Sequence, residues 1–203
     1  MLEILYEYIK NNNIFTTEEI AKELSITNKD TLNVYLERLC KKEEIYRYER
    51  GVYGRVEEIA FLGKKIHPSK REVVNHLYIH NNQGYVGEGD YILEIGLSTW
   101  CPSKRTVYTN AVTRTQQKYD TILKKPKTFI NAENYKYLRL LDCIENYNEY
   151  PIDAKKPSDI IIREINREQL DVMLLLATAQ KYYKKETLQR LLEFIKEFYY
   201  ETA

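Results

Sequence analysis

Side chains that suit contact with nucleic acid gather in two places within the first sixty residues. One group lies at the start and on the polar face of a predicted helix, and comprises Thr27, Lys29, Thr31, Asn33 and Arg38. The other lies on or near the tip of a predicted β-hairpin, and comprises Arg47, Tyr48, Arg50 and Arg55. Hydroxyl, amide and ammonium groups on a helix can bond base edges or phosphates, and arginines suit phosphates or a narrow minor groove.

A third basic group occupies residues 104–127, where seven positive charges stand against one acid, Asp120. Its members are Lys104, Arg105, Arg114, Lys118, Lys124, Lys125 and Lys127. Each phosphate that such a side chain neutralises adds close to one unit to the salt dependence of binding. The alternative interpretation is a loop face that is merely solvated.

Other chemistries find weaker support in the sequence. Glu72, His76 and His80 recur at four-residue spacing, but the HExxH pattern is absent and no cysteine lies nearby, so we interpret the histidines as solvent-facing or packed. We interpret Glu88, Asp90 and Glu94 as the charged face of a helix, and not as catalytic or metal-binding carboxylates. Neither a phosphate loop nor a dinucleotide fingerprint is present, and Cys101 has no histidine partner. We expect no catalytic residue, cofactor or metal.

The overall charge conceals this uneven distribution. The 203 residues carry 31 basic and 30 acidic side chains, a net charge of +1. Residues 1–62 have a net charge of −3, residues 63–130 of +6 and residues 131–203 of −2. No apolar run approaches the ~20 residues of a spanning helix, and the acidic amphipathic start does not fit a signal peptide. Three widely separated cysteines suit free thiols, so we expect a cytoplasmic protein without membrane contact.

Residues 1–62 predict three helices followed by the hairpin. Helix 2–10 ends at a run of asparagines, Thr16 or Thr17 caps the second helix, and Thr27 with Asp30 is expected to cap the third. The inner face of the third helix comprises Leu32, Tyr35, Leu36 and Leu39. Alternating residues on both sides of positions 49–51 predict a hairpin over 45–56.

This order of elements is typical of a winged helix–turn–helix, in which the third helix enters the major groove of DNA. Winged helices also serve as protein–protein modules, and Glu37, Glu43 and Glu44 near the reading surface count against DNA. The arginine-bearing hairpin nevertheless favours DNA binding.

Residues 63–203 predict a mostly helical mixed α/β domain with a few short strands, so that the whole chain is α+β. We expect a connector over 57–66 and a helix with Pro68 in its first turn that runs to about residue 80. A short helix over 88–96 should end at Gly96, and strands are expected over 106–109 and 127–130. Asn131 should cap the next helix, a loop holds Pro151 and Pro157, and helices follow over 169–183 and 186–200.

The ordered segments of nearly the whole chain resemble one known family. These segments are TTEEIAKEL, IYRYERGVYGRV, GYV with IGLSTWCP, RTVYTN, KPKT and NYKYLRLLD. In this order they are similar to the AbiEi-type antitoxins and transcriptional regulators of type IV toxin–antitoxin systems. The order of the segments and the GLST stretch before Pro102 carry the resemblance. Ser25 departs from it, because glycine is frequent at that turn; Ser25 must adopt a left-handed conformation or use another turn.

The resemblance implies an N-terminal winged helix, residues 1–62, that binds inverted repeats in double-stranded DNA at its own promoter. It also implies a C-terminal domain, residues 63–203, with antitoxin activity and auxiliary DNA binding. The functional partner would be a nucleotidyltransferase-like toxin, with no stable complex required. We expect a monomer or weak dimer that binds DNA cooperatively. A stand-alone repressor without a toxin and a winged-helix protein-interaction module remain alternatives.

Overall fold

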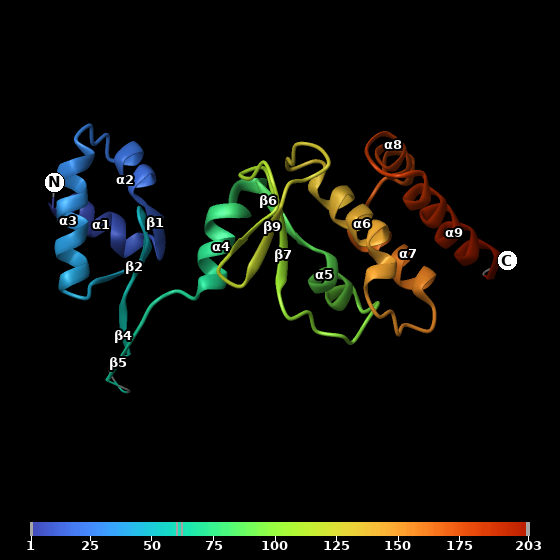
Figure 1. Cartoon of the computed structure of the whole chain (residues 1–203), viewed down its shortest axis with the longest axis horizontal. Helices are drawn as coiled ribbons and strands as arrows, with labels where there is room; N and C mark the ends of the chain where they lie inside the picture. Colours follow the sequence, from blue (N-terminus) through green and yellow to red (C-terminus); the bar gives the residue numbers. More distant parts are fainter. Residues whose placement is uncertain (1, 60, 62, 202–203) are drawn as a thin grey trace. The chain divides into compact units, whose positions relative to one another are not determined.

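A computed structural model describes residues 2–59, 61 and 63–201, and it is a mixed α+β structure, as predicted (Figure 1). The chain forms two compact units, Met1–His76 and Leu77–Ala203. The division falls later than the expected boundary after residue 62, because a second hairpin and most of a helix belong to the first unit.

The N-terminal unit consists of small helices and a three-stranded antiparallel sheet in the order β1-β3-β2. Its first elements are α1 (Leu2–Asn11), β1 (Ile14–Thr16), α2 (Thr17–Glu23), α3 (Lys29–Lys41), β2 (Ile45–Glu49) and β3 (Val52–Arg55). The three predicted helices and the hairpin are confirmed, whereas β1 was not expected. Three residues of β1 are too few to show an alternating pattern.

Local hydrogen bonds explain where α2 begins and ends. The Thr16 hydroxyl accepts from the Glu19 backbone N–H, and the Glu19 carboxylate accepts from the Thr16 N–H at 2.7 Å, which is a capping box. At the other end Ser25 adopts φ 52°, so the left-handed alternative holds. The Ile26 N–H bonds the Ala21 carbonyl at 2.8 Å across this turn.

The start of α3 corrects one prediction. Asn28, and not Thr27 with Asp30, caps the helix, because the Asn28 Oδ1 atom accepts from the N–H groups of Asp30 and Thr31 at 3.1 Å each. The apolar stripe of α3 then packs inward, as predicted. The buried core of this unit includes Leu5, Phe15, Ile20, Leu32, Leu36, Leu39 and Tyr53.

Residues 57–66 form a second antiparallel hairpin instead of the expected connector. It pairs β4 (Glu57–Ile59) with β5 (Lys64–Ile66). Helix α4 (Lys70–Tyr78) follows, and Pro68 precedes it instead of lying in its first turn. Ser69 and Glu72 form reciprocal bonds that cap α4, with the Ser69 N–H 2.7 Å from Glu72 Oε2. A short 3₁₀ turn, His80–Asn82, leads onward within the second unit.

The C-terminal unit contains a four-stranded sheet in the order β6-β7-β9-β8. The strands are β6 (Gly84–Gly87), β7 (Arg105–Thr109), β8 (Gln116–Lys118) and β9 (Thr121–Lys124). Only the β7–β9 pair is parallel among these described strands. The expected strand over 106–109 is confirmed, but the one over 127–130 is wrong. Pro126 interrupts the chain there, and the side chain of Asn110 bonds both backbone groups of Ile130.

Helices cover this sheet and continue beyond it. They are α5 (Glu88–Ile95), α6 (Tyr135–Glu145), α7 (Pro157–Arg167), α8 (Val172–Tyr182) and α9 (Lys185–Glu201), with a 3₁₀ turn at Tyr147–Glu149. Gly96 ends α5 with φ 84°, as predicted. Asn131 accepts hydrogen bonds from the backbone in the turn just before α6. The expected loop around Pro157 is wrong, because this proline begins α7.

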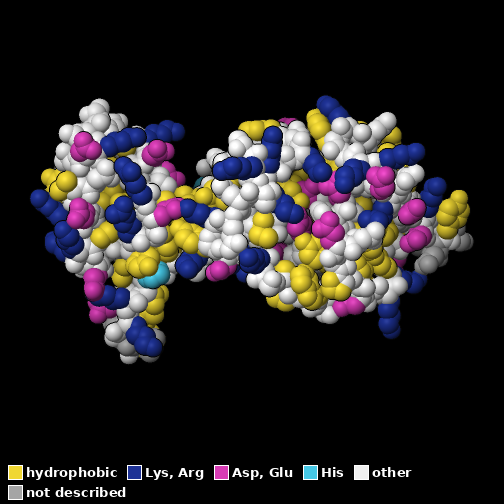
Figure 2. Space-filling view, viewed as in Figure 1, with side chains coloured by type: hydrophobic (Ala, Val, Ile, Leu, Met, Phe, Trp, Pro, Cys, Tyr) yellow, Lys and Arg dark blue, Asp and Glu magenta, His cyan; other side chains and the backbone are white. Residues whose placement is uncertain are grey.

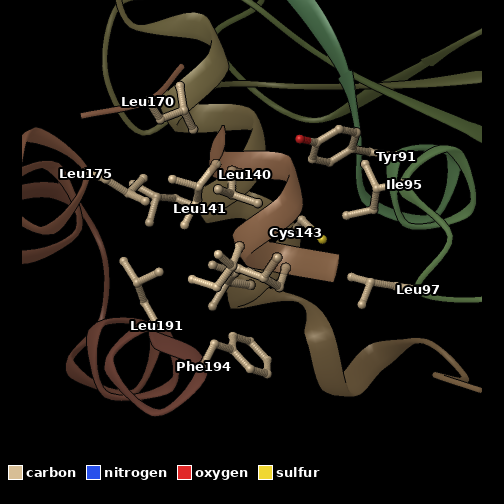
Figure 3. Packing of buried hydrophobic residues seen from close by; sticks show 14 of the residues in the cluster. Tyr91, Ile95, Leu97, Leu140, Leu141, Cys143, Leu170, Leu175, Leu191 and Phe194 are labelled. Carbon is tan, nitrogen blue, oxygen red and sulfur yellow. The ribbon is translucent and has the colours of Figure 1, made fainter. Parts of the chain in front are cut away.

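Helix α6 forms the centre of the second unit. Figure 3 shows Leu140, Leu141 and Cys143 between Tyr91 of α5 on one side and Leu191 of α9 on the other. All three α6 side chains are fully buried. On the surface of this unit Trp100 lies against Tyr150, with ring centroids 5.7 Å apart, and both rings contact Gly89 closely enough to leave little room for a side chain. Within the described ranges, no helix combines the length and apolar character needed to cross a membrane.

Candidate nucleic-acid interface

An open groove of about 700 Å³ runs between α3 and the hairpin of β2 and β3. We call it the α3–hairpin groove. Four predicted site residues line it together, namely Lys29, Asn33, Arg47 and Arg50. The remaining lining is Thr16, Thr17, Glu18, Val34, Glu37, Cys40, Gly51, Val52 and Tyr53.

The helical side of the groove follows from the amphipathic pattern of α3. Burial of Leu32, Leu36 and Leu39 fixes one face of the helix against the core. Lys29 and Asn33 lie four residues apart on the exposed side, so their side chains occupy the same face one turn from each other. The Asn28 cap fixes the position at which this face begins.

The strand side of the groove depends on a tight turn and a bulge. Gly51 adopts φ 80° at the tip, a conformation that favours glycine, and leaves Arg50 exposed. The pairing of β2 with β3 shifts register between Arg47 and Glu49. Such a bulge changes the direction of neighbouring side chains. The Arg47 Nε atom donates to the Glu49 carbonyl oxygen at 3.3 Å, which holds the guanidinium along the hairpin.

Acids also line the groove. Glu37 bonds Lys41 at 2.9 Å, and this contact, with the weaker field of Arg47, lowers the pKa of Glu37. Its carboxylate is therefore ionised at neutral pH. Glu18 is exposed at the start of α2. Figure 2 shows basic and acidic side chains interspersed over the visible face of the N-terminal unit. The groove is thus a mixed surface with three cationic groups, and not a uniformly positive one.

The other predicted residues of the first unit lie outside the groove. Thr27 and Thr31 line a separate hollow together with Ile4, Leu24, Ser25, Ile26 and Asn28. Arg38 lies over the ring of Tyr35, 5.8 Å from its centroid. These side chains share the exposed surface of the unit, but they do not converge with Arg47 and Arg50.

Tyr48 and Arg55 make contacts within the chain. The Tyr48 hydroxyl donates to the Pro68 carbonyl oxygen and lies 3.0 Å from His67 Nδ1. The Arg55 guanidinium bonds the Lys10 carbonyl oxygen and the Glu57 carboxylate. Both residues therefore tie the hairpin to neighbouring segments of the first unit, and their contact with DNA stays a prediction.

Ion pairs within the fold compensate part of the positive charge of the basic group at residues 104–127. Lys124 bonds Glu88 and Lys127 bonds Glu145, at 2.5 and 2.8 Å respectively. Lys104 donates to Gln117 Oε1 at 3.0 Å and remains exposed, and Lys125 is exposed directly after β9. Arg105 is the first residue of β7 and is half-buried. At least two of the seven cations, Lys124 and Lys127, are thus paired with acids that lie far away in the sequence.

Glu88 corrects the interpretation of residues 88–94 as a charged helix face. Its side chain is buried, and it accepts hydrogen bonds from Tyr108 at 2.6 Å, Tyr150 at 2.8 Å and Lys124. Burial raises the pKa of Glu88, but these bonds together outweigh burial and leave the pKa below its usual value. Glu88 is therefore a buried carboxylate with its charge compensated inside the fold.

A second buried carboxylate, Asp142, accepts from Tyr85 and from Tyr183, the latter at 2.9 Å. Burial raises the pKa of Asp142 to about 7, against the lowering effect of the two tyrosine bonds. The rings of Tyr85 and Tyr108 stack with centroids 5.4 Å apart. Tyrosines thus supply apolar area and a hydroxyl donor to the same core, which accounts for part of their abundance in this chain.

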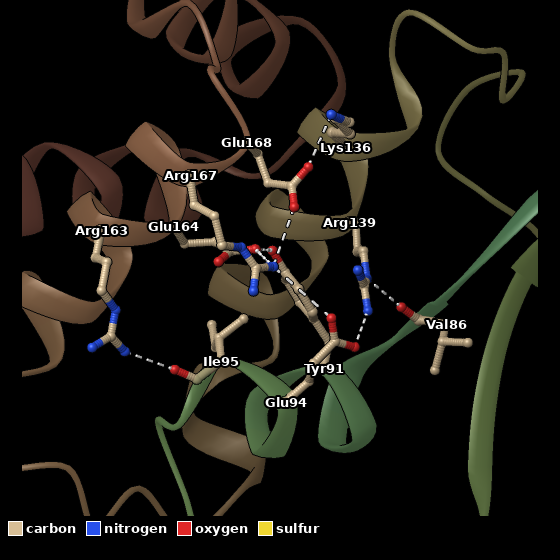
Figure 4. A network of polar contacts seen from close by, with 10 residues as sticks. All are labelled: Val86, Tyr91, Glu94, Ile95, Lys136, Arg139, Arg163, Glu164, Arg167 and Glu168. Atoms are coloured by element: carbon tan, nitrogen blue, oxygen red, sulfur yellow. Dashed lines mark hydrogen bonds and ion pairs between the residues drawn. The ribbon is translucent and has the colours of Figure 1, made fainter.

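A third polar cluster joins α5, α6 and α7 (Figure 4). Tyr91 donates to the buried Glu164 at 2.7 Å, and the Arg139 guanidinium lies 4.0 Å from the centre of the Tyr91 ring. Arg139 also bonds the Val86 carbonyl oxygen and Glu94, while Arg167 bonds Glu164. Because these groups satisfy one another, the cluster holds helices together and offers no unpaired group for chemistry.

The histidine helix also has a structural explanation. His76 Nε2 lies 2.9 Å from Glu19, the residue that caps α2, and Glu72 caps α4. In the described part of the chain, no group of three or more His, Cys, Asp or Glu side chains is placed to hold a metal ion.

Glu18 and Val34 are among the lining residues that were not predicted from the sequence, whereas Glu37 was expected near the reading surface. The signal for Val34 was present, because it is an apolar residue outside the inward stripe of α3. Searches against models of known protein families and among curated proteins find no match to this chain.

Proposed function

We propose that the N-terminal unit contains a winged helix–turn–helix that binds duplex DNA in the α3–hairpin groove. The order helix, strand, helix, helix and hairpin, with the sheet order β1-β3-β2, supports this proposal. The observation that carries it is the convergence of Lys29, Arg47 and Arg50 with the amide of Asn33 on one groove. Cationic groups that flank a helix with hydrogen-bonding side chains fit phosphates beside base edges.

In the proposed complex α3 enters the major groove with its N-terminal half. Asn33 then faces base edges, and Lys29 lies nearest the entering phosphate backbone. Arg47 and Arg50 on the hairpin contact phosphates beside the groove. Their guanidinium groups present paired donors that match phosphate oxygens.

The side chains of Glu37 and Glu18 set a limit on nonspecific affinity. A carboxylate near the phosphate backbone repels it, so general attraction to DNA is weaker than three cations alone would give. Binding should therefore depend on operator sequence, while the three cations make it sensitive to salt.

The decisive experiment measures binding of the full chain to duplex DNA from its own upstream region by fluorescence anisotropy across a salt series. Arg47→Ala and Arg50→Ala should each weaken binding and each lower the salt slope by about 0.9. Lys22→Ala is the matched control, because Lys22 is exposed on α2 and does not line the groove. Equal slopes for all four proteins would overturn the assignment of the groove.

We further propose that the chain is a cytoplasmic autoregulator and the antitoxin of a type IV toxin–antitoxin system. This finer proposal rests on the similarity of its segment order to the AbiEi-type family. It requires that co-expression of the chain restores growth to cells that express the neighbouring nucleotidyltransferase-like toxin. DNA binding without restoration of growth would favour a stand-alone repressor.

A further inference from the structure

We propose that Asn33 and Val34 select an A·T base pair, with Asn33 reading adenine and Val34 contacting the thymine methyl group. This inference rests on the proposed DNA-binding function and assigns a base preference to the same groove. It identifies a specificity-determining pair where the sequence pattern had indicated only general contact.

The position of Val34 is the first observation. Val34 is 47% exposed although it lies on α3, where Leu32, Leu36 and Leu39 are almost completely buried. It lines the α3–hairpin groove between polar and charged side chains. On the major-groove edges of base pairs, the thymine methyl group is the apolar feature that such a side chain can contact.

Asn33 supplies the second observation, because it is the adjacent exposed residue of α3 and lines the same groove. A carboxamide carries both a donor and an acceptor. It can therefore bond adenine N7 and N6 at the same time, whereas guanine presents only acceptors at the corresponding positions. Asn33 and Val34 together match the two bases of one A·T pair or of two adjacent pairs.

Glu37 adds a base preference of its own further along the same groove. It lies one helical turn after Asn33, on the same side of α3 and in the same groove. Its carboxylate, ionised beside Lys41, repels the N7 and O6 acceptors of guanine and can accept from the amino group of cytosine or adenine. Four residues of helix span about 6 Å, which is close to two base-pair steps, so Glu37 acts about two pairs away from the one that Asn33 reads.

The test begins with selection of duplexes from a random library by the full chain, followed by affinity measurements on the selected sequence. Thymine at the preferred position is then replaced by uracil, which removes the methyl group alone. We expect uracil to weaken binding by about fourfold, the effect of one buried methyl group. Replacing the A·T pair by G·C should weaken binding by about tenfold or more.

The variants separate the two contacts. Val34→Ala should bind thymine and uracil duplexes within about twofold of each other, and Asn33→Ala should lose most of the preference for A·T over G·C. Ile4→Ala and Asn11→Ala are matched controls, because both residues are exposed on α1 and do not line the groove. The controls should keep both preferences.

Some results would overturn the inference alone. Salt-dependent binding without an A·T preference would refute the base assignment and leave DNA binding in place. The same conclusion would follow if the A·T preference survived Asn33→Ala and the effect of the thymine methyl group survived Val34→Ala. Absence of salt-dependent binding to any duplex would refute the proposed function, and the base assignment with it.

Discussion

The ammonium nitrogen of Lys124 lies 2.5 Å from a carboxylate oxygen of Glu88, a side chain that is only 3% exposed. The two residues are 36 positions apart, on β9 and at the start of α5. Lys124 therefore compensates a charge inside the C-terminal unit, whereas its neighbour Lys125 is exposed. Two adjacent lysines of the same basic run thus have different physical roles.

This contrast leads to a prediction about stability. Lys124→Ala should lower the free energy of unfolding by about 2 kcal/mol, because it leaves the buried Glu88 charge with its two tyrosine donors alone. Lys125→Ala should change it by less than about 0.5 kcal/mol. Urea denaturation of both variants measures the difference. Equal losses would mean that the Glu88 contact contributes no net stability.

The exposed cations of the same region allow a prediction about DNA. Lys104→Gln combined with Lys125→Gln should lower the salt slope of operator binding by about two units, since each charge that contacts a phosphate contributes close to one. Anisotropy across a salt series measures the slope. An unchanged slope would confine the interface to the N-terminal unit and identify these cations as solvated surface charges.

Asp142 should make the stability of the protein depend on pH. Its pKa is about 7 in the folded chain and 3.8 without the fold, so the folded state holds an extra proton between these values. The stabilisation that this proton provides is complete below the unfolded pKa and is lost as the pH rises through 7. Between pH 5 and pH 8 the free energy of unfolding should fall by about 2 to 3 kcal/mol on account of this group.

Asp142→Asn is the comparison that isolates this effect. The amide cannot ionise, but its oxygen can still accept a bond from Tyr85 or Tyr183. Denaturation at a series of pH values should therefore show a smaller decline for the variant than for the natural chain. Parallel curves for the two proteins would show that Asp142 does not change its protonation between pH 5 and pH 8.

Capping of α3 gives a prediction with a neighbouring control. Asn28→Ala should cost about 1 kcal/mol of stability, because two backbone N–H groups lose their acceptor. Thr27→Ala should cost less than about 0.5 kcal/mol. Thermal unfolding of the two variants distinguishes these expectations. A larger loss of stability for Thr27→Ala than for Asn28→Ala would support Thr27 as the capping residue, as the sequence predicts.

The fold was predictable where the residues of one short segment determine the structure of that segment. The stripe of α3, the turn at Gly51 and the left-handed end of α5 at Gly96 are local features, and each was identified correctly. The hairpin of β4 and β5 was missed because its strands are three residues long and mostly exposed. Helix α7 was missed because Pro157, a residue that suits the first helical turn, was interpreted as part of a loop.

In the candidate site, too, residues placed by local sequence patterns could be predicted, whereas contacts between segments far apart in the sequence could not. Lys29, Asn33, Arg47 and Arg50 could be identified because helix and hairpin patterns place them on exposed faces. The partners of Arg55 and Lys124 could not, since Lys10 and Glu88 are brought to them by tertiary packing. A count of charges along the sequence does not reveal which cations are already compensated.

Trp100 makes the two units separable by spectroscopy. It is the single tryptophan of the chain, and it packs beside Tyr150 and Gly89 in the C-terminal unit. Its fluorescence therefore records the opening of that unit alone, while circular dichroism records helices in both. Comparing the two signals during denaturation reveals whether the units unfold in one cooperative step or in two.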